Sequence, residues 1–216
     1  MQIKPLVLCL AALAAASQAQ AIGITDGKGD YVPGFTGSKA GDLDVIGSFV
    51  TYNLATDSFV FSGTMDANIG TTPGGFYVWG VNKGAGTAGF AANGYGGIFF
   101  DAVVILNSNG TGRVGAINLA AGSVKISGTT IIAEVPGSLL PSTGFAKQAY
   151  TWNLWPRDVA LTGFAAISDF APDNSNAPVT VLGVVPEPTT ALLLAAGLVG
   201  LSLRARRFSA TSFSAR

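Results

Sequence analysis

Asp44 to Tyr52 reads DVIGSFVTY, and Ser58 to Met65 reads SFVFSGTM, with the five residues NLATD at 53–57 between them. In both stretches apolar side chains alternate with small or polar ones, which is the pattern of half-buried strands. The connecting residues include Asn and Asp, which favour turns. Residues 44–65 are therefore predicted to form a β-hairpin, and the fold is expected to be built around it.

The remainder of residues 22–183 has the same character. Glycine is abundant, with 29 in the chain, and no stretch keeps a helical period. Residues 22–41 are expected to be an irregular lead-in, and the glycine-rich residues 82–97 a long exposed loop. Further strands are expected at 76–81, 98–106, 113–119, 124–126, 130–135, 150–154, 160–167 and 179–183. This spacing predicts an all-β domain over 22–183, an antiparallel β-sandwich with a jelly roll as the alternative.

Charge and composition exclude several functions. Residues 22–185 contain seven Lys or Arg and eleven Asp or Glu, a net charge of −4. This balance argues against nucleic acid as a partner, because nucleic-acid binding depends on clustered basic residues. The chain has no histidine, and its single cysteine is Cys9. Zinc, copper and haem sites of the usual kinds, and Ser-His or Cys-His nucleophiles, are thereby excluded, and the protein is not expected to be an enzyme.

Two groups of aspartates are candidate calcium ligands. Asp42 and Asp44 project to one side of an extended segment, because side chains alternate along a strand. Asp169 and Asp173, with Asn174 and Asn176, form a second oxygen-rich group. Calcium prefers such oxygen ligands. The alternative is that these residues cap turns at strand ends.

Tryptophans offer a second kind of candidate site. Trp152 and Trp155 lie three residues apart, so in one strand they face opposite sides. Trp155, or Trp79 beside Tyr77, could stack on a sugar ring, which would make the domain a carbohydrate-binding module. The alternative is that all of them fill the core of the sandwich.

Asp101 interrupts an otherwise apolar run and needs a partner if its strand is central. An ion pair with Arg113, Lys125 or Arg157 is the first interpretation. A remote alternative is a carboxylate-based hydrolase that uses Asp101 with Glu134 or Asp158 as acid and base.

The N-terminus is predicted to be a secretory signal peptide over residues 1–21. Lys4 precedes an apolar stretch from Leu6 to Ala16, and Ala19 and Ala21 are small residues at the spacing that signal peptidase accepts. Cleavage after Ala21 makes Ile22 the first mature residue, and cleavage after Ala19 is the alternative.

The C-terminus carries three features in a fixed order. Pro186, Glu187 and Pro188 precede the uncharged run TTALLLAAGLVGLSL at 189–203, and Arg204, Arg206 and Arg207 follow that run directly. This arrangement resembles the PEP-CTERM sorting signal of Gram-negative bacteria, here at residues 184–207, followed by a basic tail at 208–216.

The resemblance implies a cellular localisation and not a catalytic activity. It implies that an exosortase recognises Pro186, Glu187 and Pro188, that residues 189–203 span the inner membrane, and that the three arginines retain the basic end in the cytoplasm. The protein would then be exported, held briefly in the inner membrane, and delivered to the cell surface or extracellular matrix. Proteins of this family are associated with exopolysaccharide and biofilm.

Overall fold

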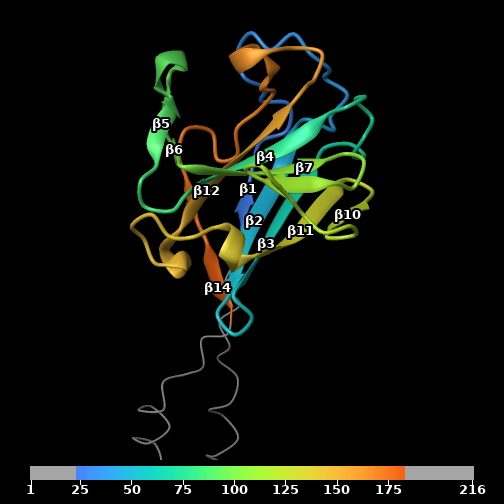
Figure 1. The fold of residues 1–216 in the computed structure, drawn as a ribbon. Helices are drawn as coiled ribbons and strands as arrows, with labels where there is room; N and C mark the ends of the chain where they lie inside the picture. The colour runs from blue at the N-terminus through green and yellow to red at the C-terminus, as the bar shows by residue number, and fades with distance from the viewer. Residues whose placement is uncertain (1–22, 183–216) are drawn as a thin grey trace, which may run out of the picture. The chain divides into compact units, whose positions relative to one another are not determined.

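The computed structural model describes residues 23–182 of the chain. The predicted signal peptide at 1–21, the sorting signal at 184–207 and the tail at 208–216 lie outside the described residues. Two antiparallel sheets of six strands each, together with a separate two-stranded hairpin, make up the described part, which contains no α-helix (Figure 1). The predicted all-β class is confirmed.

The first sheet follows the order β1-β2-β3-β11-β10, and a further short strand, β14, pairs with β2. Its strands are β1 (Ile24–Thr25), β2 (Val45–Asn53), β3 (Ser58–Met65), β10 (Val124–Ser127), β11 (Thr130–Pro136) and β14 (Thr180–Leu182). The predicted hairpin at 44–65 is β2 paired with β3, closed where Asn53 pairs with Ser58.

The second sheet follows the order β13-β12-β4-β7-β8-β9. Its strands are β4 (Phe76–Asn82), β7 (Ala102–Asn107), β8 (Gly112–Val114), β9 (Ile117–Asn118), β12 (Thr151–Arg157) and β13 (Ala177–Pro178). The separate hairpin consists of β5 (Thr87–Phe90) and β6 (Tyr95–Phe100). Four short 3-10 helices occupy connections: η1 (Ala91–Asn93), η2 (Gly137–Leu139), η3 (Lys147–Ala149) and η4 (Gly163–Ala166).

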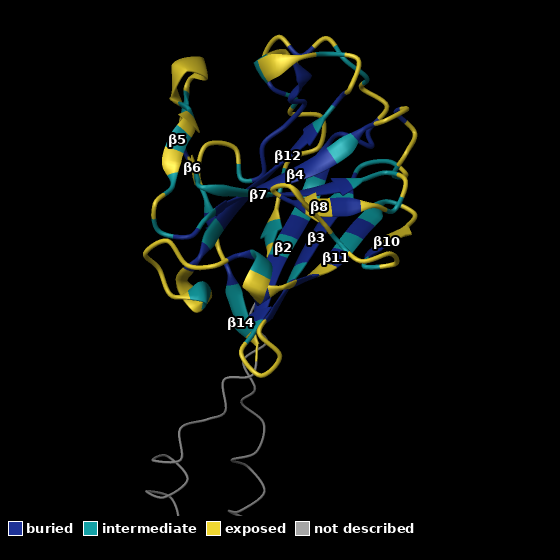
Figure 2. Ribbon diagram, in the orientation of Figure 1, coloured by how far each residue is buried: buried dark blue, intermediate teal, exposed yellow. Residues whose placement is uncertain are grey.

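The core lies between the two six-stranded sheets. Phe61 of β3 meets Trp79 of β4 edge-on, with ring centroids 6.0 Å apart, and Phe59 stacks on Tyr150 at 5.7 Å. The indole N–H of Trp79 donates to the Ser48 hydroxyl at 3.3 Å, so the polar tip of this buried ring is satisfied. Figure 2 shows the buried residues concentrated on the strands of these two sheets.

One detail of the central hairpin departs from simple alternation. The pairing of β2 with β3 shifts register between Val45 and Gly47. Strict alternation places Val45 with Phe49, on the face opposite Val50, but Val45 is fully buried and Phe49 is only half-buried. The shift redirects Val45 inward, as a β-bulge does.

Three predicted segments differ from the structure. Residues 98–106 do not form one strand, because the chain breaks at Asp101 between β6 and β7. Residues 113–119 turn back at Gly115, which has a φ of 55°, and so form β8 and β9. Residues 160–167 contain the 3-10 helix η4 and no strand.

The glycine-rich residues 82–97 are also not simply an exposed loop. Residues 87–90 and 95–100 pair as the β5–β6 hairpin, and the prediction missed it because glycine weakens a strand pattern. The rings of Phe90 and Phe100 each lie 5.0 Å from the ring of Trp155 on β12. The hairpin therefore covers one side of β12, although its tip is exposed (Figure 2).

Candidate functional site

Five aspartates from distant parts of the chain meet in the described domain. Carboxylate oxygens of Asp30, Asp44 and Asp169 all lie within 4.8 Å of one another, and so do those of Asp26, Asp30 and Asp173. Asp30 belongs to both triads. We call these five residues the aspartate cluster.

Backbone hydrogen bonds hold the two buried members in place. The N–H of Val45 donates to Oδ2 of Asp169 at 2.9 Å, and the N–H of Phe170 donates to Oδ1 at 2.7 Å. The N–H of Gly29 donates to Oδ2 of Asp44 at 2.7 Å. The Gly29 bond joins the lead-in to the start of β2, and the Val45 bond joins the start of β2 to the segment after η4, so these three segments meet at the cluster.

Two carboxylate oxygens of the cluster have no hydrogen-bond partner. Oδ1 of Asp44 and Oδ2 of Asp26 are both buried and unpartnered. Asp44 and Asp169 are each only 1% exposed, whereas Asp30 and Asp173 lie at the surface. The cluster therefore runs from the interior to the surface, and water reaches only its outer members.

The cluster has little positive charge to balance it. Lys28 pairs with Asp66 at 2.6 Å, and no ion pair among residues 23–182 includes a member of the cluster. Burial, together with the charges of Asp26 and Asp30, raises the pKa of Asp169 to about 8, although hydrogen bonds from Val45 and Phe170 oppose the shift. Burial, with the charge of Asp30, likewise raises the pKa of Asp26 to about 7. The pKa of Asp44 is also raised, chiefly by burial, although the Gly29 N–H opposes the shift. Such a group of carboxylates favours either bound protons or a bound cation.

The structure separates the predicted calcium ligands. Asp44, Asp169 and Asp173 come together, but Asp42 does not join them. Asp42 is fully buried and accepts hydrogen bonds from the backbone N–H and the hydroxyl of Thr72, both at 2.6 Å. The calcium prediction is wrong for Asp42, because both of its oxygens cap the loop at Thr72.

Asn174 and Asn176 also have other partners. The N–H of Gly97 donates to Oδ1 of Asn174, and Asn176 both accepts from the N–H of Phe99 and donates to its carbonyl at 2.7 Å. These amides fasten β6 to the loop before β13.

Asp26 and Asp30 were missed by the sequence analysis. They lie in the lead-in ITDGKGD at 24–30, where aspartates alternate with glycines. That local pattern was a signal, since oxygen ligands next to glycine are common in cation-binding loops. Their meeting with Asp169 and Asp173 depends on contacts across more than 130 residues, which no local pattern reveals.

The predicted sugar platforms at Trp79 and Trp155 are wrong. Trp79 is 0% exposed and Trp155 is 2% exposed, and Trp152 is buried as well. Trp79 lies between the sheets. Trp155 points to the other face of its sheet, where the β5–β6 hairpin covers it. The alternative interpretation, that these tryptophans pack in the core, is confirmed.

Asp101 does not form the predicted ion pair with Arg113, Lys125 or Arg157. It accepts hydrogen bonds from the backbone N–H of Lys83, the N–H of Ala85 and the hydroxyl of Thr143. Partial burial raises its pKa, but the hydrogen bonds outweigh burial and the net pKa is lowered. Asp101 thus fastens two loops together at the break between β6 and β7.

The remote acid–base pairs are not assembled by the described contacts. Glu134 is exposed on β11 of the first sheet, whereas Asp101 precedes β7 of the second sheet. Asp158 is buried and accepts hydrogen bonds from the N–H groups of Ser38 and Ala160.

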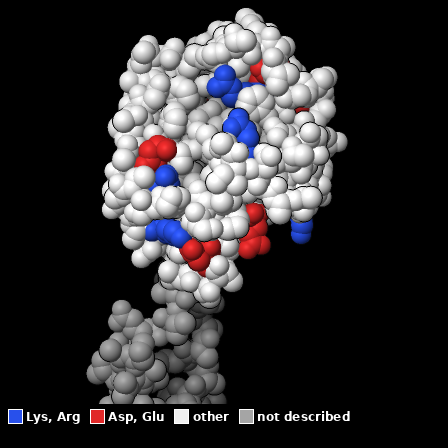
Figure 3. All heavy atoms as spheres, in the orientation of Figure 1, with Lys and Arg blue, Asp and Glu red and all other residues white. Residues whose placement is uncertain are grey.

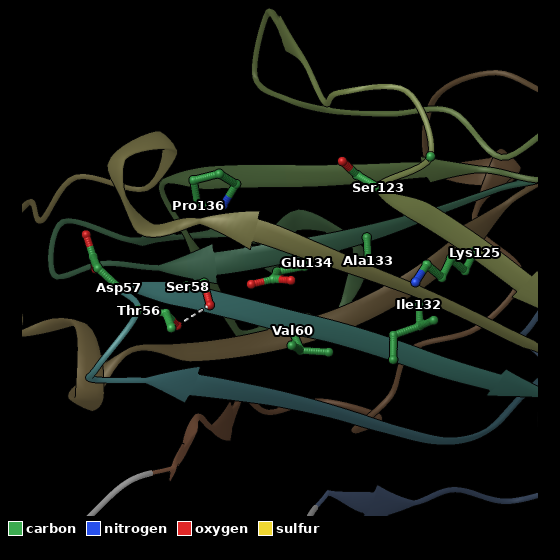
Figure 4. A pocket seen from close by; sticks show the side chains of 11 residues that line it. Thr56, Asp57, Ser58, Val60, Ser123, Lys125, Ile132, Ala133, Glu134 and Pro136 are labelled. Carbon is green, nitrogen blue, oxygen red and sulfur yellow. Dashed lines mark hydrogen bonds between the residues drawn. The ribbon is translucent and has the colours of Figure 1, made fainter.

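An open hollow of about 530 Å³ lies over β3, β10 and β11. Its lining includes the hydroxyls of Thr56, Ser58 and Ser123 and the charged groups of Lys125 and Glu134 (Figure 4). No aromatic side chain lines it. The hollow offers hydrogen-bonding groups and no ring to stack on.

Comparison with known proteins identifies the C-terminal segment. A family described as the PEP-CTERM protein-sorting motif matches residues 184–207. No curated protein and no solved structure matches the chain. Within residues 23–182, no helix combines the length and apolar character that crossing a membrane requires. The motif confirms the resemblance and indicates a protein that is exported and sorted to the cell surface by an exosortase.

Proposed function

From the sorting motif at residues 184–207, we propose that this protein is a non-catalytic component of the cell surface or extracellular matrix that associates with exopolysaccharide. The motif is the observation that carries the proposal, because it specifies delivery to the place where such polymers lie. The domain supports the non-catalytic part of this proposal, because its tryptophans pack in the interior and most of its candidate acids accept hydrogen bonds from loops.

The proposed route begins with removal of residues 1–21 by signal peptidase. Residues 189–203 then anchor the chain in the inner membrane, with Arg204, Arg206 and Arg207 on the cytoplasmic side by the positive-inside tendency. Fifteen residues of helix span about 22 Å, short of a hydrocarbon layer of about 30 Å. Such a short span makes a weak anchor. Exosortase cleavage near Pro186 to Pro188, ahead of the span, would then release the domain to the surface.

The hollow over β3, β10 and β11 is the proposed contact for polysaccharide. Its hydroxyls, Lys125 and Glu134 can donate and accept hydrogen bonds along a hydroxyl-rich polymer. On the face that Figure 3 shows, charged side chains are few and are scattered among uncharged ones. The proposed polysaccharide contact therefore lies on the first sheet, away from the tryptophans.

The sorting part is tested in a host that carries an exosortase. A variant with Pro186→Ala, Glu187→Ala and Pro188→Ala is compared with the wild type, and the wild type in an exosortase-deficient host is the control. We expect the variant and the control to stay uncleaved in the inner membrane while the wild type is processed. Equal processing and release of the variant and the wild type would show that the segment is only an anchor.

The polysaccharide part is tested by co-sedimentation with the host exopolysaccharide. Lys125→Ala with Glu134→Ala leaves the net charge unchanged and removes two groups from the hollow. Lys28→Ala with Asp66→Ala, which removes an ion pair elsewhere, is the matched control. We expect only the first pair to reduce binding. Absence of binding by the wild type would refute the exopolysaccharide role and leave the sorting result untouched.

A further inference from the structure

We propose that the aspartate cluster is a calcium site, with the first ion held between Asp30, Asp44 and Asp169. Calcium lies about 2.4 Å from its oxygen ligands, so two ligand oxygens on one ion can be at most about 4.8 Å apart. The oxygens of this triad meet that limit without any movement of the chain.

A buried carboxylate oxygen without a hydrogen-bond partner supports a bound cation, and this observation is independent of the number of acids in the cluster. Asp44 is 1% exposed, its Oδ2 is occupied by the N–H of Gly29, and its Oδ1 has no partner. Leaving a buried carboxylate oxygen unpartnered is costly, because the water that solvated it has been removed. A cation bound by Asp44 through Oδ1 would give that oxygen a partner.

The second triad reinforces the same place. Asp26 has a buried unpartnered Oδ2, and its triad shares Asp30 with the first. The carboxylate of Asp30 can therefore bridge from the buried triad to the exposed Asp173 side. Ligands that run from the interior to the surface give an ion both protein oxygens and room for water.

The chemistry of the ligands selects the metal. Every member of the cluster offers carboxylate oxygen, and residues 23–182 contain no histidine or cysteine, the ligands that zinc and copper sites favour. Magnesium binds oxygen at about 2.1 Å in a strict octahedron, which limits opposite oxygens to about 4.2 Å. Calcium accepts six to eight oxygen ligands in flexible geometry, so carboxylates contributed by separate segments suit calcium better than magnesium.

An ion at this position would add a further link between three segments that hydrogen bonds already bring together. The lead-in supplies Asp26 and Asp30, the start of β2 supplies Asp44, and the segment after η4 supplies Asp169 and Asp173. Calcium binding is therefore expected to raise the thermal stability of the folded domain. At a calcium concentration about one hundred times the dissociation constant, the melting midpoint should rise by roughly 5–10 °C.

The test uses the full-length protein purified in detergent, with thermal melting followed by tryptophan fluorescence and calcium binding followed by calorimetry. Melts at pH 8 are compared in chelator, in about 5 mM calcium and in about 5 mM magnesium, which exceeds the dissociation constants of about 10⁻⁴–10⁻³ M typical of extracellular calcium modules. We expect a clear upward shift in calcium and a smaller one in magnesium.

Asp30→Asn is the decisive variant, because Asp30 is exposed, makes no described hydrogen bond and belongs to both triads. It should fold in chelator and lose most of the calcium shift. Asp44→Asn tests the buried ligand, and Asp57→Asn, at an acid that pairs with Lys147 outside the cluster, should keep the full shift. No calcium shift in the wild type, an equal shift in magnesium, or a full calcium shift in Asp30→Asn would each overturn the calcium assignment.

Discussion

Replacing Gly80 with alanine should destabilise the domain by overpacking Trp155. Gly80 lies on β4 opposite Asn153 of β12, and the indole of Trp155 lies across it. A Cβ atom at position 80 would come closer than 3.0 Å to two atoms of the six-membered ring of that indole, and would lie 3.1 Å from Cβ of Phe100. Trp155 is 2% exposed and is covered by Phe90 and Phe100, so it cannot swing into solvent.

The size of the effect follows from two opposing terms. The ring must retreat by roughly 1 Å to restore ordinary contact, and such overpacking of a dense interior costs about 1–3 kcal/mol. Alanine in a strand recovers about 0.5–1 kcal/mol relative to glycine by restricting the unfolded chain. A net loss of about 1–2 kcal/mol lowers the melting midpoint of a domain of this size by roughly 2–8 °C.

Chemical and thermal unfolding measure the loss, and Gly96→Ala is the matched control. Gly96 lies in β6, and its added Cβ would have only Cβ of Ala91 within 4 Å, at 3.9 Å. It should be neutral or slightly stabilising. In a Trp155→Phe background the six-membered indole ring is absent, so Gly80→Ala should cost at least about 1 kcal/mol less than in the wild type. Equal costs in both backgrounds would refute the assignment of the clash to Trp155.

Three further predictions concern other parts of the chain. In chelator, the melting midpoint should fall between about pH 5 and pH 8. The reason is that burial raises the pKa of Asp169 to about 8 and of Asp26 to about 7, so the folded state retains protons that the unfolded chain has released; a midpoint that rises across this range contradicts it. Asn176→Ala should cost about 1–3 kcal/mol and speed amide exchange at Phe99, because it removes the side chain that both accepts from and donates to the Phe99 backbone; unchanged exchange at Phe99 would argue against this. N-terminal sequencing of protein from the cell envelope should begin at Ile22 or within two residues of it, and an intact Met1 on most of the material would refute the signal peptide.

The sequence predicted the elements whose information is local. The hairpin at 44–65 follows from alternation and a turn, and β10 and β11 correspond to the strands expected at 124–126 and 130–135. Elements that depend on distant partners were missed. The β5–β6 hairpin is held by Trp155 and Asn176, which lie more than fifty residues further along the chain. Its own glycine-rich sequence has too few apolar side chains to indicate a strand.

The candidate site likewise contains residues that the local sequence predicted and contacts that it could not predict. Asp44, Asp169 and Asp173 were recognised because each lies in an oxygen-rich stretch, but their partners could not be assigned. Asp42 lies two residues before Asp44 and shares its local pattern, yet it belongs to the loop at Thr72. Alternation predicts the face of the strand to which a side chain points, but it does not predict which residues that side chain contacts. Only the three-dimensional arrangement distinguishes a loop cap from a member of the cluster.

Delivery and the proposed calcium site are connected through the lead-in. Residues 23–41 contain only the two-residue strand β1, so few ladder hydrogen bonds hold this segment to the rest of the domain. Asp26 and Asp30 bring negative charge from the lead-in to the buried Asp44 and Asp169, and without a cation this repulsion works against closure of the domain. The sorting motif indicates that the chain is exported, and extracellular calcium modules bind in the range of about 10⁻⁴–10⁻³ M. A site of that affinity would be filled only after export, where the ion would strengthen the attachment of the lead-in to the sandwich.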